Sequence, residues 1–303
     1  MEFKKLEIFL KVVELQSFTK ASCALDIAQS VVSRTIRTLE KDLNQVLFYR
    51  DGHGVRPMPS ALVLAEHAKS IFRQLDLARS EVGNSGKRVG ETVRVGLPST
   101  LARLVGRPVV ADLFRTHPAI KPCVLEGLSF SLMQQLEAGV IDLAIGYHTT
   151  WRPNLQLTTV FEEPMVFIGL RNKMQKFPAA SVDLKTLSQE PLIIATRPNN
   201  VRMLIEMQMA ALMLAPNVVL EVDCMPLILD LVADGLGYAI LPLHTLSQVK
   251  DPSLYDYRFF TPEINTRVMV ATFEGRSLRK PVQTVKEAFV SALKNLQVAP
   301  IIK

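Results

Sequence analysis

The spacing of apolar residues changes once along the 303-residue chain, close to residue 90, and this change limits the possible folds most strongly. Before it, apolar residues recur three and four positions apart, which is typical of amphipathic helices. After it, short apolar strands alternate with helices. Repeated strand–helix–strand units predict a mostly parallel sheet with helices on both faces. We therefore expect a mainly helical N-terminal part followed by an α/β part.

The first 58 residues predict a small helical domain with a β-hairpin. Ser17 is a good N-cap for the second helix, and Asp26-Ile27-Ala28 makes a tight connection, as in a helix-turn-helix. A turn at 51–54 then separates two short apolar stretches, which predicts a wing. The predicted helices span 4–15, 18–25 and 29–44, and the wing is formed by 46–49 and 55–56.

The outward face of the third helix is polar, and no acidic residue occurs between Ala28 and Leu39. It carries Gln29, Ser30, Ser33, Arg34 and Arg37. The formal net charge is +6, and residues 1–88 hold 14 Lys and Arg against 10 Asp and Glu. This balance favours a polyanionic partner. The alternative is an ordinary polar face in water.

Pro59 opens a long helix, at a position where its missing N–H costs nothing. The helix carries a stripe of apolar residues at heptad spacing. We favour a dimer-forming helix, with packing on its own domain as the alternative, and a flexible hinge at 83–86. The stripe consists of Ala61, Leu64, Ala68, Ile71, Leu75, Ala78 and Val82.

Ser99 and Thr100 follow the first strand of the α/β part and open a helix. Hydroxyls together with helix N–H groups suit a carboxylate or another small anion. The alternative is a plain helix cap. Further strands are predicted at 93–97, 121–126, 143–146, 164–170, 192–195, 218–222, 238–241 and 268–272, and helices at 101–116, 130–138, 201–214, 226–233 and 282–296.

Several classes of chemistry lack the residues they need. Cys23, Cys123 and Cys224 are far apart, so we expect neither a disulfide framework nor a metal site, and we expect a buried thiol at Cys224. The histidines form no metal-like pair, and no catalytic constellation or phosphate loop occurs. No cofactor is expected. We also expect no signal peptide and no membrane span, since no run of 18 apolar residues occurs.

Seven linked segments resemble the LysR-type transcriptional regulators. They are SFTKA at 17–21, QSVVSRTI at 29–36, LEKDL at 39–43, LFYR at 47–50, FRTHP at 114–118, LEAGVIDLAI at 136–145 and ADGLGYAILP at 233–242. The resemblance extends through the whole chain. One departure is Asn44, which stands where glycine usually follows the third helix. Asparagine tolerates the left-handed conformation of a helix end, so the change is mild.

The resemblance implies a fold class and its boundaries. The fold is an α/β protein with an N-terminal winged helix-turn-helix, a long linker helix, and a two-lobed domain like the periplasmic binding proteins. The expected domains are 1–58, the linker and hinge 59–89, and the effector-binding domain 90–303. Two crossover strands near 162–164 and 266–268 then divide this last domain into lobe I, 90–163 with 267–303, and lobe II, 164–266.

The resemblance also implies sites and partners. We expect Gln29, Ser30, Ser33 and Arg34 to reach base edges or nearby backbone, and Arg37, Arg50 and Arg56 to contact phosphate or the minor groove. The dimer contact is expected to be formed by Leu64, Ala68, Ile71, Leu75 and Ala78. The expected effector cleft contains Ser99, Thr100, Gly127, Ser129, Gly146, Tyr147, Thr196, Val201 and Arg202.

The resulting hypothesis is a cytoplasmic, ligand-responsive regulator. Its partners are double-stranded promoter DNA, a small organic anion, further copies of itself as a dimer of dimers, and RNA polymerase as an additional candidate. A solute-binding protein and an enzyme on an α/β fold are the competing classes. The helix-turn-helix argues against the first, and the lack of catalytic residues argues against the second.

Overall fold

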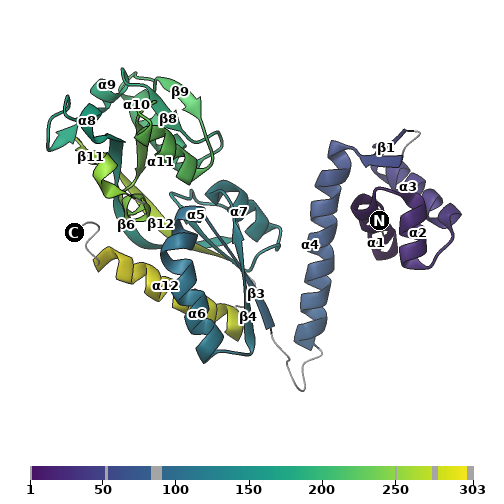
Figure 1. Cartoon of the computed structure of the whole chain (residues 1–303). Helices are drawn as coiled ribbons and strands as arrows, with labels where there is room; N and C mark the ends of the chain where they lie inside the picture. Colours follow the sequence, from purple (N-terminus) through teal and green to yellow (C-terminus); the bar gives the residue numbers. More distant parts are fainter. Residues whose placement is uncertain (1, 52–53, 83–90, 250, 275–278, 299–303) are drawn as a thin grey trace. The chain divides into compact units, whose positions relative to one another are not determined.

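The computed structural model describes residues 2–51, 54–82, 91–249, 251–274 and 279–298. The chain forms two compact units, one of residues 1–87 with the short stretch 138–140, and one of the remaining residues up to 303 (Figure 1). The hinge expected at 83–86 lies outside the described residues.

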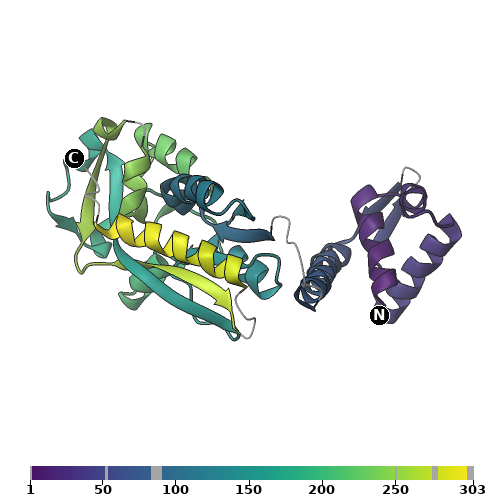
Figure 2. The ribbon, with the colours of Figure 1, turned by 90° about the horizontal axis from the view of Figure 1, so that it is seen from below.

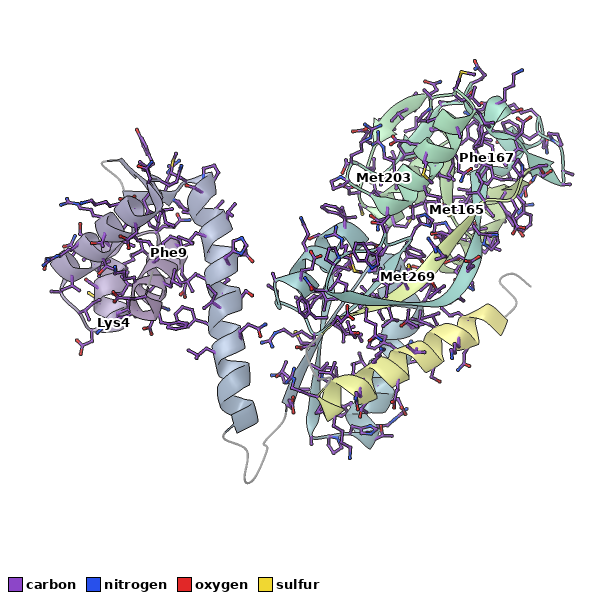
Figure 3. The ribbon with its side chains drawn as sticks, turned by 180° about the vertical axis from the view of Figure 1, so that it is seen from behind. Lys4, Phe9, Met165, Phe167, Met203 and Met269 are labelled. Atoms are coloured by element: carbon purple, nitrogen blue, oxygen red, sulfur yellow. The ribbon has the colours of Figure 1, made fainter. Side chains whose placement is uncertain are left out.

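The N-terminal unit contains three short helices, a two-stranded hairpin and one long helix. The apolar residues of the helices meet in a common core, and Phe9, labelled in Figure 3, is fully buried there. Ser17 caps the second helix, as predicted, by accepting a bond from the Lys20 amide at 3.2 Å. Asn44 ends the third helix at φ 49°, in the left-handed region. The elements are α1 Phe3–Leu15, α2 Phe18–Leu25, α3 Gln29–Leu43, β1 Phe48–Asp51, β2 Gly54–Pro57 and α4 Pro59–Val82.

The first turns of α4 pack on their own unit. Ala61 and Ala65 belong to the core of the helical domain, and Ala68 is also fully buried. Phe72 meets Phe3 of α1 edge-on, with 6.1 Å between ring centroids. This half of the apolar stripe therefore packs on its own domain, which was the alternative to a dimer contact. Leu64, Ile71 and Leu75 stay half-buried, and the side chain of Ala78 lies outside the described ones.

The C-terminal unit has two lobes, each with its own apolar core. We call lobe I the part around the core that includes Val95, Phe161 and Phe289. Lobe II surrounds two cores built by residues between Met165 and Ile264, and Figure 3 labels Phe167 and Met165 there. Lobe I holds β3 Glu91–Leu97, α5 Ser99–Leu101, a π-helical turn Ala102–Gly106, α6 Arg107–Thr116, β4 Ile120–Glu126, α7 Ser129–Glu137, β5 Leu143–Tyr147, β12 Asn265–Phe273 and α12 Lys280–Val298.

The second lobe is formed by the chain between the two long strands. It contains two strands that the sequence analysis missed, β7 and β11. The elements are β6 Leu155–Leu170, whose first half lies in lobe I, α8 Arg171–Met174, β7 Ser181–Val182, α9 Leu184–Leu187, β8 Leu192–Ile194, α10 Asn200–Ala211, β9 Val218–Glu221, α11 Met225–Ala233, β10 Ala239–Pro242, the 3₁₀ turns η2 Leu243–Gln248 and η3 Pro252–Leu254, and β11 Tyr255–Phe260.

The main sheet is mixed, so the prediction of a mostly parallel sheet was wrong. Its order is β4-β3-β5-β12-β6-β11-β7, with β10 also on β6. Only β4-β3-β5 and β11-β7 are parallel neighbours within it. Strand β6 leads the chain out of lobe I and β12 brings it back, so the two run antiparallel. Helix α12, yellow in Figure 2, covers one face of the lobe I sheet.

The predicted helix 101–116 is interrupted by a π-helical turn at Ala102–Gly106. Pro108, next to this turn, has no N–H with which to continue the regular ladder. A local change of hydrogen-bond register accommodates it. The turn follows the short helix α5, which contains Ser99 and Thr100.

Candidate DNA-binding and ligand-binding sites

Helix α3 turns one face inward and one face outward. Val32, Ile36 and Leu39 are fully buried in the N-terminal core. The polar residues predicted to bind DNA lie on the other side: Gln29, Ser30, Arg34 and Arg37 are exposed, and Ser33 is half-buried. Arg56 of β2 is exposed, while the side chain of Arg50 lies outside the described ones. The fold therefore leaves this polar, acid-free helix face accessible.

The hairpin is fastened to α3 through Glu40. Its Oε1 accepts bonds from the amides of Leu47 and Phe48 at 2.9 and 3.3 Å. Asp42, near the end of α3, lies 3.4 Å from Lys5 of α1. Both carboxylates of this helix thus serve internal contacts at its C-terminal end. The exposed polar groups of the first two turns are therefore neutral or positively charged.

A cavity of about 100 Å³ lies between the lobes of the C-terminal unit. One side is formed by the C-terminal ends of parallel strands β3 and β5 and the start of α7, where ligands of open α/β sheets usually bind. The other side is formed by strands β8 and β10 and by helices α10 and α11. Its volume is smaller than the roughly 150 Å³ that holds one benzene molecule in a protein core.

Six of the nine residues expected in the cleft line this cavity. They are Ser99, Thr100, Ser129, Tyr147, Val201 and Arg202. Residues that the sequence analysis missed form most of the apolar wall in lobe II. They include Leu192, Ile193, Ile194, Ile205, Val222, Met225, Ile228, Ile240 and Leu241. These residues read in the sequence as ordinary core strands and helices, because nothing local shows that their elements end at a cleft.

Gly127, Gly146 and Thr196 are not among the lining residues. A Cβ at Gly146 would lie 3.1 Å from the Cβ and Oγ of Ser129, and a Cβ at Gly127 would lie 3.1 Å from Leu132. Both glycines therefore allow α7 to approach the sheet closely. Thr196 is occupied by Asp223, which accepts bonds from both its amide and its hydroxyl.

The positive charge expected from Arg202 is not free. The Arg202 side chain is only 7% exposed, and its Nε donates to Glu206 at 2.7 Å. Its Nη1 donates to Glu221 at 2.6 Å and to the Ala195 carbonyl at 2.8 Å. The charged residues that line the cavity are this one guanidinium and the carboxylates of Glu206 and Asp223. The lining thus carries no net positive charge.

Glu206 is the centre of this ion-pair network. Besides Arg202, it contacts Arg197 at 2.9 Å. Burial works against the charged carboxylate, but the bonds from Arg197 and Arg202 outweigh it and hold the pKa of Glu206 below its ordinary value. The carboxylate therefore stays ionised, and the network holds the start of α10 beside the cavity.

Cys224 is exposed, so the expected buried thiol was wrong. The residue stands at the N-cap of α11, outside the lobe II core. Among the described residues, no group of three His, Cys, Asp or Glu side chains could hold a metal ion. No helix in the described ranges is long and apolar enough to cross a membrane.

Two family models match the two parts of the chain. The model "Bacterial regulatory helix-turn-helix protein, lysR family" matches residues 3–61, and "LysR substrate binding domain" matches residues 86–294. The chain belongs to the LysR family. The resemblance inferred from the sequence is thereby confirmed, and so is the fold class.

Similar proteins span the whole chain. The nitrogen assimilation regulatory protein nac of Escherichia coli K12 is 26% identical over 295 residues, covering 97% of this chain and 95% of the relative. A full-length OxyR variant from Pseudomonas aeruginosa shares the fold, with a TM-score of 0.65, 19% identity and full coverage of both chains. The LysR family transcriptional regulator CbnR has a TM-score of 0.63 at 18% identity, and the match covers 96% of this chain and 99% of CbnR.

Membership in the LysR family defines the general activity. The protein is a DNA-binding transcriptional regulator with an effector-binding domain, and not an enzyme. Regulators of this family bind promoter DNA and small-molecule effectors.

Arg202→Met should lower stability, because it removes the buried one of the two arginines that bind Glu206, and it also removes the donor to the Ala195 carbonyl. We expect a loss of about 2 kcal/mol at pH 7. Folding lowers the pKa of the Glu206 carboxyl below its ordinary value of 4.5. The ionised carboxylate therefore stabilises the folded protein above about pH 4.5, and this stabilisation is lost as the pH falls. Thermal melts from pH 7 to 4 should therefore show the difference shrinking below about pH 4.5.

Arg197→Met is the matched control, since Arg197 binds the same carboxylate but is 67% exposed. Exposed ion pairs contribute about 0–1 kcal/mol, so this variant should melt close to the wild type. Equal losses in both variants would show that the burial of Arg202 is unimportant.

Proposed function

We propose that this LysR-family regulator reads DNA through the exposed face of α3 and senses a small ligand in the cavity between its lobes. The observation that supports it best is the accessible, acid-free polar face of α3, held by a core that buries the opposite face. Cytoplasmic location follows from access to DNA. We retain the domain limits 1–58, 59–89 and 90–303, the lobe limits 90–163 with 267–303 and 164–266, and RNA polymerase as a candidate partner.

In the proposed complex, α3 enters the major groove. Gln29, Ser30, Ser33 and Arg34 lie on its first two turns, where a recognition helix usually contacts bases. Arginine can pair bidentately with guanine, and glutamine with adenine. Arg37, one turn further along, and Arg50 and Arg56 of the hairpin are assigned to phosphates or the minor groove.

Arg34→Ala should change which DNA sequences are bound. A base-reading arginine contributes about 1–3 kcal/mol of discrimination. We expect at least a roughly 10-fold weaker affinity for genomic fragments selected by the wild-type protein, and a relaxed preference at one or two positions. Selection from a genomic fragment library followed by footprinting measures both.

Arg37→Ala separates base reading from phosphate binding. It should weaken binding to all sequences alike and reduce the salt dependence by about one counterion. Arg115→Ala, an exposed charge of the other unit, controls for the lost charge itself. If Arg34→Ala keeps the wild-type sequence preference, Arg34 does not read a base.

We propose that the protein acts as a homo-oligomer, a dimer of dimers, with α4 as one interface. Ala68 is covered within its own unit and Ala78 is not described, so the available part of the predicted seam is Leu64, Ile71 and Leu75. Leu62 and Val63 form a second apolar face of the same helix, 51% and 62% exposed. Two faces of α4 are therefore candidates for the contact.

Ile71→Asp should weaken self-association and DNA affinity together, because it places an unpaired charge in a dry interface. Light scattering across a concentration series measures the oligomer. Leu62→Asp is the matched variant on the other face. Dissociation by Leu62→Asp alone would move the seam to that face, and an unchanged oligomer in both variants would remove α4 from the interface.

The proposed effector is a small organic molecule with an apolar body and one polar or anionic group. Its body would lie on the apolar wall of lobe II, and its polar group on the hydroxyls of Ser99, Thr100 and Ser129. Because Arg202 is already paired, recognition of an anion would depend on hydroxyl and amide donors alone.

Thr100→Val removes a hydroxyl and keeps the shape of the cavity wall. Loss of this hydroxyl should weaken effector binding by about 1–3 kcal/mol if the ligand group that it binds stays buried. Calorimetry with small carboxylic acids and their neutral amides tests the ligand class, with Thr116→Val, exposed on α6, as control. Equal affinities in wild type and Thr100→Val would remove Thr100 from the site, whereas preserved DNA binding would show that the fold is intact.

A further inference from the structure

A buried ion pair lies where the first long strand passes between the lobes. Glu163 of β6 is 1% exposed. Its Oε2 accepts a bond from the His244 amide at 3.0 Å and lies 2.7 Å from the Nδ1 of the same residue. The other ring nitrogen of His244, Nε2, lies 3.2 Å from the carbonyl oxygen of Leu296. The cavity lining does not include Glu163 or His244.

Both ring nitrogens of His244 therefore face oxygen acceptors. Only the imidazolium carries a hydrogen on both nitrogens, so the geometry favours the charged form. Burial opposes the charge, but the bond to Glu163, its negative charge and the Leu296 carbonyl together raise the pKa of His244 above its ordinary 6.5.

The same side of the sheet gathers further polar groups around Glu163. Residues that lie opposite each other on antiparallel strands point to the same face of the sheet. Thr266 lies opposite Glu163, and Val268 lies opposite both Phe161 and Tyr147. All five side chains are therefore on one face. Tyr147 Oη, Thr266 Oγ1 and Glu163 Oε1 are buried without a hydrogen-bond partner among the described residues. Burial and the Glu163 carboxylate raise the pKa of Tyr147.

The other titratable groups of this crossover belong to the opposite face. Arg267 of β12 lies opposite Glu162 of β6 in the strand pairing there. His148 interacts with both, and burial, followed by the charge of Arg267, lowers the pKa of His148. The pKa values of His148 and His244 are thus shifted in opposite directions. Leu296 of α12 offers only its carbonyl, and η2 beyond His244 offers Ser247 and Gln248, which do not titrate.

Three parts of the unit meet at His244. Leu296 belongs to α12 of lobe I, His244 to lobe II, and Glu163 to the strand that joins them. Two further bonds cross between the lobes: Asn200 Nδ2 to the Tyr147 carbonyl, and Gln248 Nε2 to the Thr100 carbonyl, both at 3.0 Å. Tyr147 and Thr100 line the cavity.

We infer that His244 is a proton-carrying tie that holds lobe II against the C-terminal helix of lobe I and thereby keeps the cavity walls together. When His244 loses its proton, one of its two acceptors loses its donor, and the lobes separate more easily. The tie acts on the unliganded protein, so it does not depend on which effector binds.

The first test measures melting temperature against pH in the full-length protein. Because folding raises the pKa of His244, its stabilisation is complete below the unfolded value of about 6.5 and is lost as the pH rises through the folded value. The wild type should melt roughly 5 °C or more above His244→Gln between pH 5.5 and 6.5. This difference should shrink towards pH 9.

Two variants sharpen this test. Glu163→Gln keeps the shape and removes the charge, so it should also abolish the pH-dependent component. His148→Asn, at the same crossover, should show the opposite trend, with its difference from the wild type growing as the pH rises. A pH-independent difference for both His244→Gln and Glu163→Gln would overturn the inference.

The second test distinguishes a tie between lobes from local support of the η2 turn. Hydrogen exchange at pH 6.5 should be faster in His244→Gln within residues 97–102 and 199–203, which carry the cavity edges. Faster exchange confined to residues 243–248 would show that His244 stabilises only its own turn, and it would overturn the inference even if the melting curves shift.

Discussion

The antiparallel pairing of β6 with β12 is the constraint on which the C-terminal unit depends. Nine residues of β12, from Asn265 to Phe273, pair with residues 155–164 of β6, with one irregularity at Val268 and Met269. The second half of β6 then pairs with β10 and β11 in lobe II. One strand thus belongs to both lobes. The chain passes between the lobes along these strands, and Glu163 and Thr266 lie at the place where they leave lobe I.

The cavity follows from this arrangement. The parallel strands of lobe I end at one edge, and their ends supply small hydroxyl side chains, whereas lobe II supplies an apolar wall. The charges near the cavity are used by the protein itself: Arg202 binds Glu206 and Glu221, and Asp223 binds Thr196. The lining therefore offers an apolar surface and a few hydrogen-bonding groups, and its one guanidinium is already paired.

The N-terminal unit is small, and it combines a buried core with an exposed polar face on α3. Its core buries one side of α3, and Glu40 fastens the hairpin to the same helix. Helix α4 contributes Ala61 and Ala65 to this core and leaves other apolar side chains available. A single helix therefore completes the core of the N-terminal unit and leaves an apolar surface exposed.

The sequence by itself determined the helices of the N-terminal unit, the Ser17 cap, the left-handed Asn44, the outward residues of α3 and the family, because these depend on neighbours a few positions apart. It also placed Ser99, Thr100 and Tyr147 at the cleft. Only the tertiary structure decided the mixed sheet, the apolar lobe II wall, the neutralised Arg202 and the Glu163–His244 pair. Glu163 and His244 are 81 positions apart, and His244 and Leu296 are 52 apart. Such contacts arise from the path of the chain between the lobes, which no local pattern of residues encodes.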